Sequence, residues 1–206
     1  MSGSFAGRGA TPHRAPTLTI DAIAALYRRR GHEQYSGEPV THLQHALQAA
    51  CLAEQEGASD ALLSAALLHD LGHLLHDHEG TPTLRGLDDA HQYRVVPFLR
   101  GLLPASAIAA IAGHVSAKRY LCATRPDYHA GLSQDSQRSL RLQGGAFSPA
   151  EAQAFIEAEG SLDAVRLRLW DDRAKTPGVK TPGLAHFLAH VQRCAREEGA
   201  SGATQA

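Results

Sequence analysis

The sequence feature that most constrains the fold is the dipeptide His69-Asp70, which lies inside the apolar run 65–73 (AALLHDLGH). An imidazole and a carboxylate in a stretch otherwise suited to a buried helix carry a large desolvation cost, and metal coordination is one of the few interactions that offset it. The run is too short and too interrupted to span a bilayer. A core histidine hydrogen-bonded to its neighbour is the competing interpretation, so the rest of the chain must decide.

Further metal-binding side chains recur at positions that helical periodicity directs inward. His45 falls in the apolar stripe of a helix that we expect to begin after an N-cap at Thr41 and to stop at Gly57. Three more candidates follow downstream in predicted helices: His91, His114 and Asp171. Each alone is more often a core or surface residue. The ordered set is more specific, because it supplies four imidazoles and two carboxylates from five separate helices.

Nitrogen and oxygen ligands without thiolates suit iron, manganese or zinc, and an aspartate can bridge two metal ions. The three cysteines, Cys51, Cys122 and Cys194, have no ligand spacing and are expected to be buried small hydrophobic side chains.

At this point the residues match a known family. The chain resembles the HD-domain superfamily and, more narrowly, the small mixed-valent di-iron oxygenases of phosphonate catabolism, which are related to myo-inositol oxygenase. The similar segments together span about residues 20–193: YSGEPVTHLQHA (35–46), GLDDAH (86–91), His114-x-x-x-Lys118, SLRLQGG (139–145) and LRLWDDRAK (167–175).

The resemblance implies a dinuclear centre. One iron would be held by His45, His69, Asp70 and Asp171, and the other by Asp70, His91 and His114, so that Asp70 bridges the two ions.

The resemblance also implies a substrate pocket beside the irons. Tyr35 and Glu38 would form a gate over the open coordination position, and Glu38 would meet a substrate ammonium. The residues expected to grip a phosphonate are His73, Lys118, Ser136, Gln143 and Arg168. His73 follows His69 by one helical turn, and Lys118 stands in the same relation to His114. Solvated helix faces are the alternative interpretation for Lys118 and Arg168.

By resemblance, an Fe(II)/Fe(III) pair uses dioxygen to cleave the C–P bond of a 1-hydroxyphosphonate. The expected substrate is 2-amino-1-hydroxyethylphosphonate, which would give glycine and phosphate. The trimethylammonio analogue, giving glycine betaine and phosphate, is the alternative. A trimethylated ammonium is usually held by an aromatic cage, and a chain with five Tyr, five Phe and one Trp makes such a cage hard to assemble.

Two other functional classes remain open at this stage. A dinuclear HD-domain phosphohydrolase would use nearly the same six ligands, but it offers no role for Tyr35, Glu38 or the segment 143–145. A non-catalytic metal-binding or nucleotide-sensing module ranks last, because it needs no cationic pocket.

The composition indicates a small intracellular enzyme. A chain of 206 residues, 43% of them hydrophobic, can bury one core, and we expect one domain over residues 17–197 with flexible termini at 1–16 and 198–206. The net charge of −1, without a basic block, argues against a nucleic-acid partner. Three scattered cysteines favour a reducing compartment, the cytoplasm. No transmembrane segment is expected, and the oligomeric state stays open.

Helical patterns dominate the chain, so the predicted fold is an all-α HD-domain bundle with a dinuclear metal site. The expected helices are 20–30, the segment from Thr41 to Gly57, one capped by Ser59 that carries His69-Asp70, one begun by Asp88-Asp89, the Ala-Ile-rich stretch from Ala105, 133–143, 148–159 opened by a capping box, one from Ser161, and 184–196.

Overall fold

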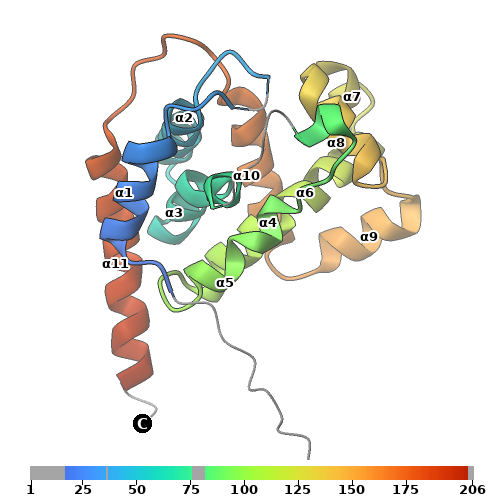
Figure 1. Ribbon diagram of the computed structural model, residues 1–206. Helices are drawn as coiled ribbons and strands as arrows, with labels where there is room; N and C mark the ends of the chain where they lie inside the picture. The colour runs from blue at the N-terminus through green and yellow to red at the C-terminus, as the bar shows by residue number, and fades with distance from the viewer. Residues whose placement is uncertain (1–16, 36, 76–81, 204–206) are drawn as a thin grey trace, which may run out of the picture.

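The fold, seen in a computed structural model that describes residues 17–35, 37–75 and 82–203, is built from helices (Figure 1). Within these residues the β-type pairing consists of two isolated bridges, Gln34 with Thr41 and Arg100 with Leu103. The all-α prediction is confirmed. The expectation for residues 1–16 lies outside the described residues, and the predicted domain boundaries stay a prediction.

The elements follow one another in a simple order along the chain. They are α1 (Ile20–Arg30), α2 (His42–Gln55), α3 (Asp60–Leu68), the 3-10 helices η1 (Leu71–Leu74) and η2 (Pro82–Arg85), α4 (His91–Arg94), α5 (Val96–Leu99), α6 (Ala105–Thr124), α7 (Tyr128–Gly131), α8 (Gln134–Leu142), α9 (Pro149–Glu157), α10 (Ser161–Arg173) and α11 (Leu184–Ala203).

Helix α3 forms the centre of the core. Every residue from Leu62 to Leu68 is buried, because this helix is apolar on nearly all sides. It packs against α2, α6 and α11, and α10 packs across α2 and α6. Figure 1 shows α3 in the middle, with α1 and α11 on one side and α6 on the other. Large side chains from the surrounding helices complete this core: Ile23, Trp170 and Phe187.

Side-chain caps set the starts of several helices where the sequence predicted them. Thr41 and Gln44 form a capping box at α2, and Ser148 forms one with Glu151 at α9. Ser59 accepts a hydrogen bond from the backbone of Leu62 and thereby caps α3.

The predicted helix through His69-Asp70 needs a correction. Helix α3 ends at Leu68, and the backbone turns at Asp70 (φ −103°, ψ 8°) into η1. This turn brings Gly72 against the backbone of His91. A Cβ on Gly72 would lie 2.3 Å from the carbonyl oxygen of His91, so only a glycine permits this approach. The apolar run 65–73 therefore does not continue as one helix, although its residues favour a helix.

Two other helix boundaries differ from expectation. The helix predicted from Asp88-Asp89 begins at His91, after Ala90 in a left-handed conformation (φ +50°). Helix α11 continues to Ala203, beyond the expected end at Arg196. The described helices include none that combines the length and the hydropathy needed to cross a membrane.

Candidate metal centre

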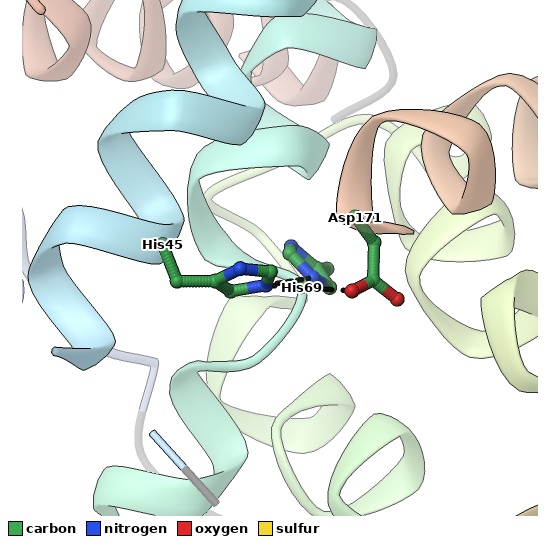
Figure 2. Close-up of side chains that lie close together, drawn as sticks. All are labelled: His45, His69 and Asp171. Atoms are coloured by element: carbon green, nitrogen blue, oxygen red, sulfur yellow. Dashed lines mark hydrogen bonds and ion pairs between the residues drawn. The ribbon is translucent and has the colours of Figure 1, made fainter. Parts of the chain in front are cut away.

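The six predicted metal ligands come together in the fold as two buried clusters. The first cluster consists of His45 from α2, His69 at the end of α3 and Asp171 from α10, and Figure 2 shows these three side chains pointing toward one another. The second cluster consists of Asp70, His91 from α4 and His114 from α6. Within each cluster, one ligand atom from every residue lies within 4.8 Å of the others.

The spacing of the ligand atoms suits a metal ion in each cluster. In the first, His45 Nε2 lies 3.2 Å from His69 Nε2 and 3.5 Å from Asp171 Oδ1. In the second, His91 Nε2 lies 3.1 Å from His114 Nε2. Ligands about 2.0–2.1 Å from a shared ion stand about 2.8–3.4 Å apart in octahedral or tetrahedral geometry, so these distances are close to those of a metal site.

Asp70 lies between the two clusters, with one carboxylate oxygen toward each. Its Oδ2 is 3.5 Å from Nε2 of both His45 and His69. Its Oδ1 is 3.3 Å from His91 Nε2 and 3.7 Å from His114 Nε2. The turn that ends α3 produces this orientation, and it supports the predicted bridging role of Asp70.

Hydrogen bonds on the far side of each imidazole fix which nitrogen faces the cluster. The Nδ1–H groups of His45, His69 and His114 donate to the backbone carbonyls of Ala174, Ala66 and Ile111, at 3.0, 2.9 and 2.7 Å respectively. His91 Nδ1–H donates to the carboxylate of Asp89 at 2.8 Å. A nitrogen that donates to an oxygen carries the proton, so Nε2 is left as the lone-pair ligand, as metal sites require.

The charges in the clusters also call for a cation. Asp70 Oδ1 and Asp171 Oδ1 are buried and accept no hydrogen bond within the described part of the chain. Burial acts to raise the pKa of Asp70, but the imidazoles of His69 and His91 outweigh it and hold that pKa well below its ordinary value. Burial lowers the pKa of His69 and His114. A buried carboxylate oxygen without a hydrogen bond, beside imidazole nitrogens that carry lone pairs, fits a metal ion.

Tyr35 covers the first cluster. Its hydroxyl donates to Asp70 Oδ2 at 2.6 Å, and its ring stacks on His45 with 4.1 Å between centroids. Burial raises the pKa of Tyr35 well above its ordinary value, so the side chain is a neutral donor. This position supports the predicted gate, because Tyr35 touches the carboxylate between the two clusters.

A small pocket, with a cavity volume of about 50 Å³, opens over the two clusters. It borders the second cluster directly through Asp70, His91 and His114. All the residues predicted for the gate and the phosphonate contact this pocket: Tyr35, Glu38, His73, Lys118, Ser136, Gln143 and Arg168.

Two cations predicted to bind phosphonate are buried rather than solvated. Lys118 is 2% exposed and donates to Ser139 Oγ at 2.7 Å; burial lowers its pKa to about 7. Arg168 pairs with Asp171 at 2.9 Å and with Asp172. Arg168 therefore orients a metal ligand while it borders the pocket, whereas Lys118 has no carboxylate partner among the described ion pairs.

His73 belongs to a dyad that supports the second cluster. Its Nδ1 lies 2.6 Å from Asp89 Oδ2, and its ring stacks on His91 with 4.0 Å between centroids. Burial acts against protonation, yet the carboxylate of Asp89 raises the pKa of His73. Asp89 thus holds both His73 and His91 and was missed by sequence reasoning, since it lies just before the helix start.

Lys175 is a second pocket residue that sequence reasoning did not single out. Its Nζ lies 3.7 Å from Asp171 Oδ1 and 3.6 Å from Glu38 Oε1, and it donates to Ser136 Oγ at 3.2 Å. Glu38 is buried and also accepts a hydrogen bond from Ser133. A substrate ammonium at Glu38 would therefore compete with Lys175. Lys175 lies two residues beyond the end of α10, so helical spacing from Asp171 gave no signal for it.

Comparisons with known proteins agree with this geometry. The HD domain family matches residues 41–141. The chain is 37% identical over 175 residues to [1-hydroxy-2-(trimethylamino)ethyl]phosphonate dioxygenase (glycine-betaine-forming) of Leisingera caerulea. The alignment covers 84% of this chain and 89% of the Leisingera protein. It is also 39% identical over 182 residues to hydroxymethylphosphonate dioxygenase of Gimesia maris. That alignment covers 88% of this chain and 90% of the Gimesia protein. The chain therefore belongs to the HD-domain phosphonate dioxygenases.

Proposed function

We propose that the two clusters hold a mixed-valent iron pair and that the enzyme uses dioxygen to cleave the C–P bond of a 1-hydroxyphosphonate. The observation that carries this proposal is Asp70, whose two oxygens face two separate clusters of imidazoles below a pocket lined by Lys118, Arg168 and Lys175. The relatives named as phosphonate dioxygenases support the same chemistry. When bound, the irons supply dioxygen activation and a Lewis-acid site for the substrate oxygens.

The residues of the chain position the phosphonate and offset its charge. Lys118, one helical turn after His114, lines the pocket and pairs with a phosphonate oxygen in a charge-assisted hydrogen bond. Arg168 holds Asp171 in place and adds positive charge beside Ser136. Tyr35 excludes water from the bridge between the clusters until a substrate replaces its hydroxyl at Asp70.

The substrate that we favour is 2-amino-1-hydroxyethylphosphonate, with glycine and phosphate as products. Among the described residues that line the pocket, Tyr35 is the single Phe, Tyr or Trp side chain, and this composition gives no aromatic cage for a trimethylammonium. Several carboxylates at the rim, among them Glu38, Asp88 and Asp135, suit a primary ammonium. The trimethylammonio substrate and hydroxymethylphosphonate, on which the relatives act by name, are the alternatives.

Metal analysis and oxygen-consumption kinetics test this proposal. We expect close to two irons per chain, activity in a partly oxidised state, and the highest kcat/KM for the primary amine among the three phosphonates. If another of the three phosphonates gives a higher kcat/KM, the proposed substrate is wrong and the proposed reaction stands. Tight loading of zinc or manganese, with hydrolysis of phosphate esters in the absence of oxygen, would replace the dioxygenase by a phosphohydrolase.

A further inference from the structure

A third group of metal-binding side chains lies outside the pocket, where α11 packs against α2. Glu54 lies in the last turn of α2, and His186 and His190 lie in the first two turns of α11. One ligand atom from each of these side chains lies within 4.8 Å of the others. Glu54 and His186 are 132 positions apart in the chain, so their convergence is produced by the fold.

The spacing within α11 is that of a helical chelate. Residues four apart in a helix project from the same face, and two histidines with this spacing are a common zinc-binding pair. The two rings have their centroids 5.7 Å apart. His186 Nε2 lies 2.6 Å from Glu54 Oε1, and His190 Nε2 lies 3.6 Å from the same oxygen. Two imidazoles and one carboxylate form a known zinc ligand set, which leaves a fourth position for water.

A second, independent observation is the carboxylate behind His190. Asp60, at the start of α3, lies with Oδ1 2.6 Å from His190 Nδ1. Arg193 Nη2 lies 2.6 Å from the same Nδ1, and it is the tautomer with Nδ1–H bonded to Asp60 that leaves Nε2 as the lone-pair donor, as in zinc-bound histidines. Arg193 binds Asp60 and lowers the pKa of that carboxyl to about 2, so Asp60 is ionised.

We propose that Glu54, His186 and His190 form a zinc-class divalent metal site, separate from the dioxygenase centre, that fastens the C-terminal helix α11 to α2. The three side chains do not border the pocket over the two clusters. Their partial exposure, 15% for the His190 side chain, 34% for Glu54 and 46% for His186, lets an ion enter from solvent. Because α2 and α3 carry His45 and His69, the ion would stiffen the frame of the first cluster without taking part in the reaction.

Zinc binding is measured on the purified enzyme with its two main clusters already loaded. Equilibrium dialysis against Zn²⁺ should add one zinc per chain while iron is retained. The unfolding midpoint should rise by about 5–10 °C at free zinc about 100-fold above the dissociation constant. Both effects should be lost in His186→Asn and in Glu54→Gln, whose dioxygenase rates should stay at the wild-type value.

Two matched variants separate a metal site from an ion-pair cluster. Arg193→Gln removes a contact to Asp60 and the guanidinium nitrogen 2.6 Å from His190 Nδ1, but no ligand, so zinc binding should persist. His186→Cys supplies a thiolate, and with Co²⁺ it should show a thiolate-to-cobalt charge-transfer band that His129→Cys, at an exposed position elsewhere, lacks. Absence of the added zinc in the wild type, or its retention in both His186→Asn and Glu54→Gln, would overturn the proposal.

Discussion

The two metal clusters use the same kinds of ligand but are built in different ways. The first is framed by α2, α3 and α10, and both of its histidines donate Nδ1–H to backbone carbonyls, as His114 of the second cluster also does. In the second, His91 lies on the four-residue helix α4 and donates to the side chain of Asp89. The second cluster is also the one that borders the pocket through both of its histidines.

From this difference we infer that the first cluster is the more rigid one and that the second cluster is the one that substrate approaches. The acceptor carbonyls of the first cluster belong to Ala66 inside α3 and to Ala174 at the end of α10, so the geometry of this cluster is tied to the packing of core helices. His91 instead follows Ala90, whose left-handed backbone costs about 1–2 kcal/mol in a residue with a Cβ. We therefore expect the first ion to be held firmly and the second to be the one that is lost, exchanged or approached by substrate.

Asp70→Ala gives the largest expected effect, because Asp70 is the single ligand that faces both clusters. Its loss should reduce the metal content from about two ions per chain to near zero and abolish oxygen consumption. Metal analysis after purification measures this result. Asp163→Ala, on the exposed side of α10, is the control and should keep both ions. Two ions per chain in Asp70→Ala would show that the clusters are independent.

Gly72→Ala should empty the second cluster and spare the first. The added Cβ would lie 2.3 Å from the carbonyl oxygen of His91, so α4 must shift and take His91 with it. We expect about one ion per chain and a loss of stability of about 1–3 kcal/mol, measured by metal analysis and chemical unfolding. In Gly131→Ala the Cβ meets no atom within 4 Å, and this control should be neutral. Equal loss of both ions in Gly72→Ala would contradict the proposed division.

The contrast between the clusters also explains what the sequence could predict. His45, His114 and Asp171 were identifiable because each is a polar residue on the apolar face of a long helix. Asp89 and Lys175 lie beyond helix ends, where periodicity assigns no face, so their contacts with His91 and Asp171 appear only in three dimensions. The end of α3 at Leu68 could not be predicted either, since the turn that follows it brings Gly72 against the backbone of residue 91, a contact that the apolar pattern of residues 65–73 does not contain.

Lys118→Met should act on substrate and leave both clusters intact. Loss of a charge-assisted contact to the phosphonate costs about 1.5–3 kcal/mol, or about 10- to 150-fold in affinity, with unchanged iron content. Burial lowers the pKa of Lys118 to about 7. As the pH rises through this value the free enzyme loses the proton that the phosphonate needs. The advantage of the wild type over Lys118→Met should therefore shrink above pH 7.

The quantity to measure is the dissociation constant of the phosphonate from Lys118→Met divided by that from the wild type. The ionisation of the phosphonate itself cancels in this ratio. A ratio that stays constant from pH 6 to 9 would mean that Lys118 does not contact the phosphonate.

Glu38→Gln has the smallest expected effect and tests the side of the pocket next to the first cluster. Glu38 already pairs with Ser133 and Lys175, so a substrate ammonium gains only the difference between two polar partners, about 0.5–1.5 kcal/mol. We expect KM for 2-amino-1-hydroxyethylphosphonate to rise about 2- to 13-fold, and KM for hydroxymethylphosphonate, which lacks the amine, to stay unchanged. Because glutamine keeps the shape of the side chain, the variant removes the negative charge of Glu38 and leaves its cover over the metal centre. Equal losses on both substrates would mean that Glu38 acts with Tyr35 in covering the metal centre and does not recognise the ammonium.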